Sequence, residues 1–235
     1  MIGVSMLRVI VAAAGSQAKW GGHLGAPSHF APVRSALDRD EREPLLGRTL
    51  RMLAARGVND LWVTSPQGAE APYALLADDH GAHCVVRGSA RDEFVGTRDL
   101  WAPAGRTLIL YGDVWFTERA LDAVLRPWDG PRFFGREHGS ELTGAPWGEA
   151  FAVSWDAADA GRLDRLLTEV RAAQDRGQAD SSAGWSLLRA LQGTPLQHHI
   201  VAGPWWVEIN DATDDIDTPA DFERHPATRT AVEAR

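Results

Sequence analysis

The sequence predicts an α/β domain with a mostly parallel β-sheet, and three observations support this. Along the first half of the 235-residue chain, short apolar segments alternate with amphipathic ones, which is typical of right-handed strand-helix-strand crossovers. The first apolar segment, 7–14, is β-branched in its middle, as expected of a strand that is buried on both faces. A chain of this length with 44% hydrophobic residues is also long enough to bury a sizeable core.

The elements of the first half follow in order from that strand. The next segment, 15–43, is too long for an ordinary connection, which indicates either a functional loop or disorder. A helix is predicted over 44–57, because Leu46, Leu50 and Leu53 share one face between a proline at the start and a glycine at the end. Further strands are predicted over 60–64, 83–87 and 107–111, and further helices over 69–79 and 92–101.

The second half is less regular. A glycine-containing loop joins two predicted strands, 132–136 and 149–155. A long, arginine-rich amphipathic helix is predicted over 157–176 and a shorter one over 183–191, followed by strands over 199–201 and 205–209. We find no internal repeat and no low-complexity linker between the two halves.

Charge and composition narrow the class of partner. The chain has 24 basic and 32 acidic side chains, a net charge of -8, whereas a nucleic-acid binder presents a basic face. No segment approaches the roughly 18 to 20 uninterrupted apolar residues of a membrane span. Cys84 is the only cysteine, so no internal disulfide can form, and the N-terminal residues lack a signal-peptide pattern. We therefore expect a cytoplasmic protein without a nucleic-acid or membrane partner.

The only lysine of the chain, Lys19, lies in a loop of small residues directly after the first strand, with the sequence GSQAKWGG over 15–22. Small residues let backbone N–H groups approach phosphate oxygens, and an ammonium adds a compact positive charge. Ligands of open parallel sheets bind beyond the carboxyl ends of the strands. The loop therefore predicts a phosphate site, although a lone lysine at this place also has a purely structural interpretation.

Acidic residues predict a magnesium site at the same edge of the sheet. The strand 107–111 leads into Gly112-Asp113, where a carboxylate would hold a magnesium ion that bridges nucleotide phosphates. Residues 208–223 include seven acidic side chains and no basic one, and a divalent ion shared with Asp113 would relieve their repulsion. The structural alternatives are an ordinary Gly-Asp turn and a helix start at Thr218-Pro219.

Taken together, these segments resemble the sugar-phosphate and alcohol-phosphate nucleotidyltransferases. Four matches in chain order carry the resemblance: 9–19, the helix 44–57 with the strand after it, Tyr111-Gly112-Asp113, and the tail DIDTPAD over 215–221. The resemblance implies a three-layer, Rossmann-like α/β domain of the GT-A type with a mixed, mostly parallel sheet. It covers nearly the whole chain, so it implies one nucleotidyltransferase-like domain over 1–235, whose less regular portion around 128–205 lies on the acceptor side.

The resemblance also implies roles for single residues. Lys19, in place of the arginine of the family loop, and Asp113, which matches the first magnesium-binding aspartate, are the expected catalytic residues. Asp217 matches the aspartate of the closing motif, and Asp211 competes with it as the second magnesium ligand. The expected contacts of the nucleotide are Ala13, Ala14, Gly15, Ser16, Gln17, Lys19, Gly88, Ser89 and Gly112.

Two further positions depart from the family pattern. Gln17 stands where the second glycine of the loop is usual, and Ser28 replaces a lysine that usually contacts phosphate. The missing charge would then fall to His29, Arg34 or Lys19. The expected contacts of the acceptor are Ser28, His29, Trp147 and Glu149.

The implied reaction is the transfer of a nucleoside monophosphate from a nucleoside triphosphate to a sugar phosphate or alcohol phosphate, with Mg²⁺ as cofactor and release of pyrophosphate. Two alternatives stay open. A GT-A glycosyltransferase that uses a nucleotide sugar is disfavoured because Asp113-Val114-Trp115 lacks a second aspartate. For a non-catalytic nucleotide-binding member, Gln17 and Ser28 are evidence in favour, whereas Lys19, Asp113 and the acidic tail are evidence against. The nucleotide base, the small phosphorylated acceptor and the formation of a homo-oligomer also stay open.

Overall fold

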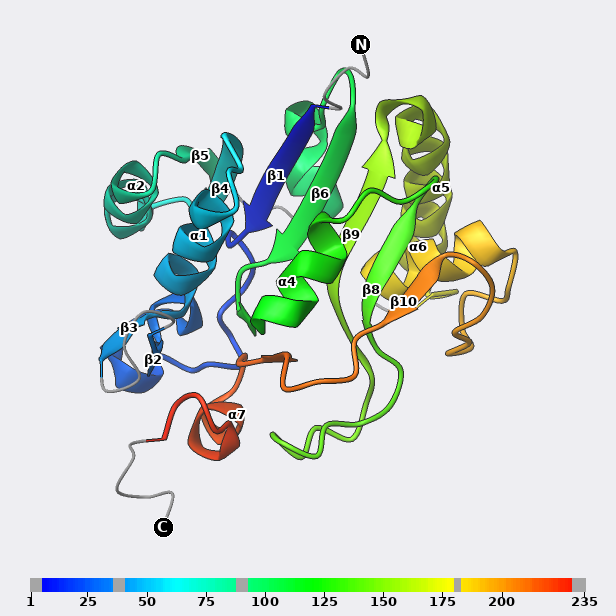
Figure 1. Cartoon of the computed structure of the whole chain (residues 1–235). Helices are drawn as coiled ribbons and strands as arrows, with labels where there is room; N and C mark the ends of the chain where they lie inside the picture. Colours follow the sequence, from blue (N-terminus) through cyan, green and yellow to red (C-terminus); the bar gives the residue numbers. More distant parts are fainter. Residues whose placement is uncertain (1–5, 36–40, 88–92, 180–182, 230–235) are drawn as a thin grey trace.

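The structure, a computed structural model, describes residues 6–35, 41–87, 93–179 and 183–229. A twisted sheet of seven strands runs through its centre (Figure 1). Across the sheet the strands are ordered β10-β8-β9-β6-β1-β4-β5. Their bounds are β1 (Leu7–Ala12), β4 (Asp60–Pro66), β5 (His83–Arg87), β6 (Arg106–Tyr111), β8 (Arg132–Arg136), β9 (Glu149–Asp156) and β10 (Trp206–Glu208). Only β9 runs antiparallel to its neighbours in this sheet, so the predicted mixed, mostly parallel sheet is confirmed.

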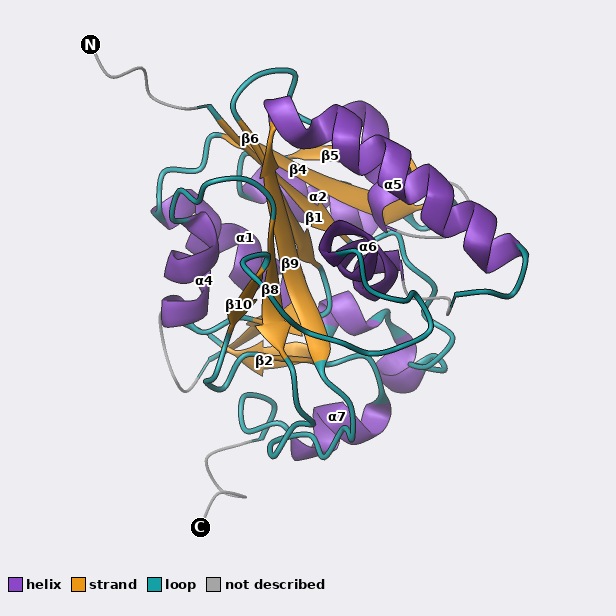
Figure 2. Cartoon of the chain, turned by 90° about the vertical axis from the view of Figure 1, so that its right-hand side faces the viewer, coloured by secondary structure: helices purple, strands orange, loops and turns teal. Residues whose placement is uncertain are grey.

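Helices cover both faces of the sheet and complete three layers (Figure 2). One core contains side chains of α1 (Leu45–Ala55), α2 (Glu70–Asp79) and α4 (Glu118–Leu125), and the other contains side chains of α3 (Glu93–Thr97), α5 (Ala157–Asp175) and α6 (Ala183–Gln192). Because side chains alternate along a strand, Val9 and Val11 of β1 enter the first core and Ile10 the second. No helix in the described part of the chain is long and apolar enough to cross a membrane.

The structure differs from the predicted elements at a few places. The predicted helix 92–101 is divided into α3 and the 3-10 helix η3 (Arg98–Leu100). The predicted strand 199–201 is irregular and its residues 199 and 200 are exposed, so there is no buried face to hold it in a sheet. Helix α4 was not predicted, because it is only eight residues long; Thr117 caps it by accepting a hydrogen bond from the backbone N–H of Ala120.

The long segment after β1 is built from short local elements. It contains two 3-10 helices, η1 (His23–Gly25) and η2 (Ser28–Phe30), and β2 (Pro32–Arg34), which pairs antiparallel with β3 (Arg42–Pro44). Trp20 and Val33 form a small core with Ile216 of the C-terminal segment. Helix α7 (Pro219–Arg224) follows that segment and begins with the predicted Thr218 cap. These pieces lie beyond the carboxyl ends of β1 and β6 (Figure 1).

Candidate active site at the carboxyl edge of the sheet

The candidate site begins where β1 and β6 end side by side. Ala12 pairs with Tyr111, and the backbone N–H of Gly112 donates to the carbonyl oxygen of Ala12 at 3.0 Å. A Cβ atom on Gly112 would lie 2.9 Å from the Cβ of Ala13 and 3.0 Å from that same carbonyl oxygen. Glycine therefore permits the close approach of the two strand ends, and Asp113 emerges next to the loop that follows β1.

A short antiparallel pair brings the acidic C-terminal segment to Asp113. Strand β7 (Val114–Trp115) pairs with β11 (Asp214–Asp215), and the N–H of Ile216 donates to the carbonyl oxygen of Asp113 at 2.8 Å. Asp214 and Ile216 are fully buried, whereas Asp215 and Asp217 are partly exposed. This alternation is that of an extended chain, so Asp215 and Asp217 project to the same side.

Four carboxylates gather at this edge, and we call Asp113, Glu149, Asp215 and Asp217 the carboxylate cluster. Burial raises the pKa of Asp113 to about 6, and the charge of Asp217 contributes to the rise. Burial likewise raises the pKa of Glu149 and that of Asp215, and Asp113 and Asp217 raise both further. Glu149 reaches the cluster because β9 is antiparallel to β6 and begins where β6 ends. The four carboxyl groups thus lie in one region, where burial and mutual repulsion oppose the ionisation of Asp113, Glu149 and Asp215.

Lys19 is the ammonium of this region. Its Nζ lies 2.5 Å from Oδ2 of Asp217, and this hydrogen bond raises the pKa of Lys19, so the side chain is charged at neutral pH. The packing of the neighbouring residues Trp20 and Ile216 in one small core holds the two segments together. The Lys19 side chain is nevertheless 70% exposed, so a ligand has access to its charge.

The predicted nucleotide contacts in the loop after β1 differ from one another in hydrogen bonding and in exposure. The N–H groups of Ala13 and Ala14 donate to Oγ1 of Thr64 at 2.9 and 3.2 Å, so these two amides are already satisfied within the protein. Gly15 and Ser16 are exposed. The predicted base contacts Gly88 and Ser89 lie outside the described residues.

Gln17 and Ser28, which both depart from the pattern of the family that the sequence resembles, contact each other. The backbone N–H and the hydroxyl of Ser28 both donate to Oε1 of Gln17 at 2.8 Å. Since a backbone N–H needs an acceptor, this pair fixes the orientation of the Gln17 carboxamide. Ser28 is only 1% exposed, so its hydroxyl ties the loop after β1 to η2 and does not face solvent.

His29 does not supply the positive charge of the missing lysine. It is 2% exposed, and its Nδ1 lies 2.9 Å from the hydroxyl of Tyr73. Burial lowers the pKa of His29 to about 4, so the ring is neutral at neutral pH. Of the residues proposed to carry that charge, Lys19 is the one that the structure places at the carboxylate cluster.

Asp211 lies at the start of helix α4 and not at the cluster. Its carboxylate accepts hydrogen bonds from Oγ1 of Thr117 at 2.7 Å and from the N–H of Thr213 at 2.8 Å. Of the two candidates for the second metal ligand, Asp217 is therefore the one next to Asp113. Sequence reasoning did not select Asp215 as a site residue. Its spacing of two residues from Asp217 in an extended segment is the signal that indicates it.

The cluster offers a cation one or two carboxylates and not a complete protein cage. Within the described ranges, no group of three or more His, Cys, Asp or Glu side chains is arranged to hold a metal ion. However, Oδ1 of Asp215 is buried without a hydrogen-bond partner. Magnesium is commonly held by one or two carboxylates, with water and substrate phosphates as its other ligands. The donor set therefore fits a magnesium ion that arrives with a phosphorylated substrate.

The predicted acceptor residues Trp147 and Glu149 lie at the exit of one loop. Residues 137–148 connect β8 to β9, and we call this segment the β8–β9 loop. Trp147 is 75% exposed near its end, two residues before Glu149 of the carboxylate cluster. A large apolar surface is thus presented to solvent at the end of the loop that leads to Glu149.

Comparison with solved structures defines the class of fold. The neighbours are sugar-phosphate and alcohol-phosphate nucleotidyltransferases, and the predicted Rossmann-like α/β fold is confirmed. No protein-family model and no curated protein sequence matches the chain. At the identities found, the similarity establishes the fold alone.

Three of these structures match over nearly the whole chain. A protein assigned as a glucose-1-phosphate thymidylyltransferase from Bacillus anthracis is 12% identical, with a TM-score of 0.60 and 94% of each chain covered. The inositol-1-phosphate CTP transferase from T. maritima is 15% identical, with a TM-score of 0.56 and coverage of 92% of this chain and 91% of that one. The 4-diphosphocytidyl-2C-methyl-D-erythritol synthase from Anaerococcus prevotii DSM 20548 is 10% identical, with a TM-score of 0.56 and coverage of 98% and 99%.

Proposed function

We propose that the protein transfers a nucleoside monophosphate from a nucleoside triphosphate to a sugar phosphate or alcohol phosphate and releases pyrophosphate. The observation that carries this proposal is the convergence of Lys19 with Asp113, Asp215 and Asp217 at the carboxyl edge of the sheet. The names of two structures with the same fold, a thymidylyltransferase and a CTP transferase, describe such transfers to a sugar phosphate and to an alcohol phosphate.

Asp113 and Asp217 are the proposed magnesium ligands, and Asp215, which has one buried oxygen without a hydrogen-bond partner, belongs to the same cluster. A bound magnesium ion would neutralise phosphate charge and make the α-phosphorus more electrophilic. Asp211 is not part of this proposal, because its carboxylate is engaged by Thr117 and Thr213.

The proposed task of the protein side chains is positioning and charge neutralisation. Lys19, exposed and charged, binds oxygens of the triphosphate. The acceptor phosphate is already ionised and needs no general base, so its oxygen attacks the α-phosphorus directly and pyrophosphate leaves. Trp147 at the end of the β8–β9 loop and Glu149 at the start of β9 are the proposed contacts of the acceptor.

The experiment measures pyrophosphate release with the four common nucleoside triphosphates, each combined with a panel of sugar phosphates and choline phosphate. We expect release that requires both the acceptor and Mg²⁺, and that disappears in Asp113→Asn. Hydrolysis of a nucleotide sugar in place of this reaction would identify a glycosyltransferase.

A nucleotide-binding protein without turnover is the second candidate. The observation in its favour concerns two residues expected to contact phosphate. Ser28 is buried and His29 is neutral, so neither supplies a positive charge. Binding of a nucleoside triphosphate with no pyrophosphate released for any acceptor would select this function.

A further inference from the structure

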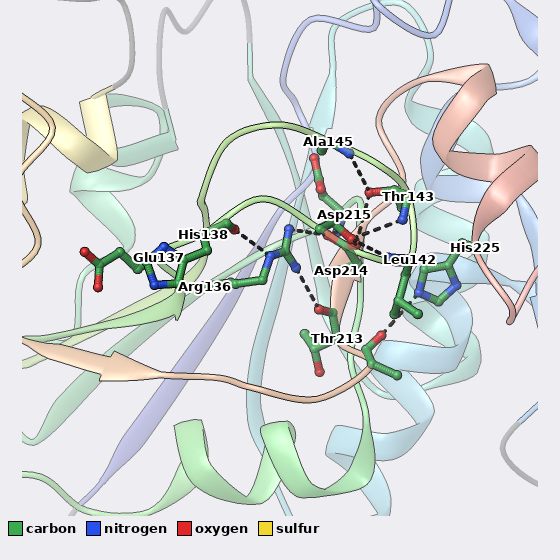
Figure 3. A network of polar contacts seen from close by, with 12 residues as sticks. Arg136, Glu137, His138, Leu142, Thr143, Ala145, Thr213, Asp214, Asp215 and His225 are labelled. Atoms are coloured by element: carbon green, nitrogen blue, oxygen red, sulfur yellow. Dashed lines mark hydrogen bonds and ion pairs between the residues drawn. The ribbon is translucent and has the colours of Figure 1, made fainter.

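Asp214 lies next to the carboxylate cluster, but its environment is different from that of Asp215. Its carboxylate is fully buried and is surrounded by hydrogen-bond donors (Figure 3). Oδ1 accepts from Nη2 of Arg136 at 2.9 Å and from the N–H of Asp215 at 3.1 Å. Oδ2 accepts from Oγ1 of Thr143 at 3.1 Å and from the hydroxyl of Ser140. Both oxygens are thus satisfied within the protein, so Asp214 is not a free ligand for a cation.

One side of this network belongs to the β8–β9 loop. Besides donating to Asp214, the Ser140 hydroxyl accepts from the N–H groups of Leu142 and Thr143 at 3.1 Å each. The loop is closed by a hydrogen bond from the N–H of Ser140 to the carbonyl oxygen of Ala145 at 2.8 Å. The conformation of the loop that leads to the exposed Trp147 is therefore organised around the Asp214 carboxylate.

The other side belongs to the acidic segment, residues 214–217. Asp214 pairs with Trp115 in the β7–β11 ladder, and its carboxylate also accepts from the N–H of the next residue, Asp215. Arg136 reinforces this side, because its Nη1 donates to the carbonyl oxygen of Thr213 at 3.5 Å. The same carboxylate therefore fixes the start of the segment that carries Asp215 and Asp217.

The burial of the Asp214 carboxylate costs free energy. A fully buried carboxylate costs several kcal/mol unless it is paired and fully hydrogen-bonded. Arg136, whose side chain is 12% exposed, supplies the opposite charge, and Ser140 and Thr143 supply the remaining donors. Because Ser140 and Thr143 belong to the β8–β9 loop and the N–H of Asp215 belongs to the acidic segment, loss of the carboxylate releases the loop and the segment together.

We propose that Asp214 is a positioning residue that fixes the β8–β9 loop relative to the magnesium-binding aspartates, and through them sets the affinity for both acceptor and cation. This inference rests on the proposed function. It assigns a role to a residue that touches neither substrate nor metal. If Asp214 served stability alone, replacing it would change neither the affinity for the acceptor nor the affinity for the cation in the folded enzyme.

The kinetic test compares three variants with the wild type. Asp214→Asn keeps the shape and removes the charge, and we expect the KM for the acceptor and the half-saturating Mg²⁺ concentration each to rise roughly 10-fold or more, with a smaller change in kcat. Ser140→Ala combined with Thr143→Val cuts only the loop side, so the KM for the acceptor should rise while the Mg²⁺ requirement stays unchanged. Asp60→Asn is the control for the loss of an ion-paired carboxylate, because Asp60 pairs with Arg8 at 2.9 Å at the amino ends of β1 and β4, away from the carboxylate cluster.

A second measurement needs neither substrate nor metal. Amide hydrogen exchange of the metal-free protein should become faster in Asp214→Asn at Leu142 and Thr143 and also at Ile216, while the amides of β1 stay protected. In Ser140→Ala with Thr143→Val, only the two loop amides should change. Asp60→Asn should leave the exchange of the Leu142, Thr143 and Ile216 amides unchanged.

Two results would overturn the inference. One is unchanged exchange at Leu142, Thr143 and Ile216 in Asp214→Asn. The other is a loss of activity that only follows the unfolded fraction, with the KM for the acceptor and the Mg²⁺ requirement unaltered. If the wild type transfers no nucleotide, the proposed function fails, while the exchange experiment still decides whether Asp214 joins the loop to the acidic segment.

Discussion

At the scale of single residues, the site combines one accessible cation with carboxylates that are costly to keep charged. Lys19 is exposed and bonded to Asp217, whereas burial and mutual repulsion oppose the ionisation of Asp113 and Asp215. Groups with strongly shifted pKa values gather at functional sites, because function and not stability requires them there. The separate effects of Lys19 and Asp113 on binding, turnover and stability are therefore testable.

Replacing Lys19 should weaken nucleotide binding without unfolding the protein. Loss of one charge-assisted contact typically costs about 1.5 to 3 kcal/mol, so Lys19→Ala should lose roughly 10-fold or more in affinity for a nucleoside triphosphate by calorimetric titration. An exposed ion pair contributes only about 0 to 1 kcal/mol to stability. Lys19→Arg, which keeps the charge, is the control; equal affinity in Lys19→Ala and the wild type would exclude the role.

Replacing Asp113 should separate activity from stability. Burial raises the pKa of Asp113 to about 6, so its ionised form at neutral pH is destabilising in the metal-free protein. Asp113→Asn should therefore abolish magnesium-dependent turnover and leave the melting temperature in EDTA equal or higher. A clearly lower melting temperature together with retained turnover would assign Asp113 a structural role.

At the scale of elements, one contact accounts for two departures from the pattern of the family that the sequence resembles, because Gln17 and Ser28 bond to each other. Gln17 accepts both hydrogen bonds that Ser28 offers, and this joins the loop after β1 to η2. A lysine at position 28 would have to enter a site that is 1% exposed, where an unpaired ammonium is strongly disfavoured. The two positions are therefore expected to change together.

This coupling predicts the outcome of restoring the family pattern. Ser28→Lys alone should lower the melting temperature by several degrees, and adding Gln17→Gly should recover part of that loss because it opens space for the longer side chain. Ser28→Ala, which loses only the hydroxyl hydrogen bond, should cost about 1 kcal/mol in chemical denaturation. If the effects of Ser28→Lys and Gln17→Gly simply add, the two residues are independent.

The sequence was informative where its signals are local. The β-branched segment 7–14 predicts β1, which ends at Ala12, and the apolar face with flanking proline and glycine predicts α1. The carboxyl-edge rule predicts that Asp113 and one carboxylate of the segment 211–217 lie in one region. The bond between Gln17 and Ser28 and the separation of Asp211 from the site depend on tertiary distances, which spacing along the chain does not contain.

At the scale of the whole molecule, the buried neutral His29 makes stability depend on pH. Burial lowers its pKa in the folded protein to about 4, whereas an unfolded histidine has a pKa of about 6.5. Between these values the unfolded state binds more protons, so the stability that is fully present above pH 6.5 is lost as the pH falls towards 4. The loss from this residue amounts to about 3 kcal/mol.

Denaturant unfolding at pH 7, 6 and 5 measures this effect. As the pH is lowered from 7 to 5, the free energy of unfolding of the wild type should fall more steeply than that of His29→Gln, which cannot take up the proton. His138→Gln is the control, because His138 is exposed, and it should follow the wild type. Parallel pH curves for the wild type and His29→Gln would contradict the assignment of His29 as a buried neutral histidine.

The edge formed by Lys19 and the carboxylate cluster is the proposed site of nucleotidyl transfer. Phosphorus NMR of a reaction that contains the protein, Mg²⁺, a nucleoside triphosphate and a sugar or alcohol phosphate would detect this transfer. We predict that pyrophosphate and a new diphosphate-linked product appear in equal amounts, and that neither forms with Asp113→Asn. Orthophosphate as the only product, or an unchanged triphosphate with every acceptor, would contradict the claim.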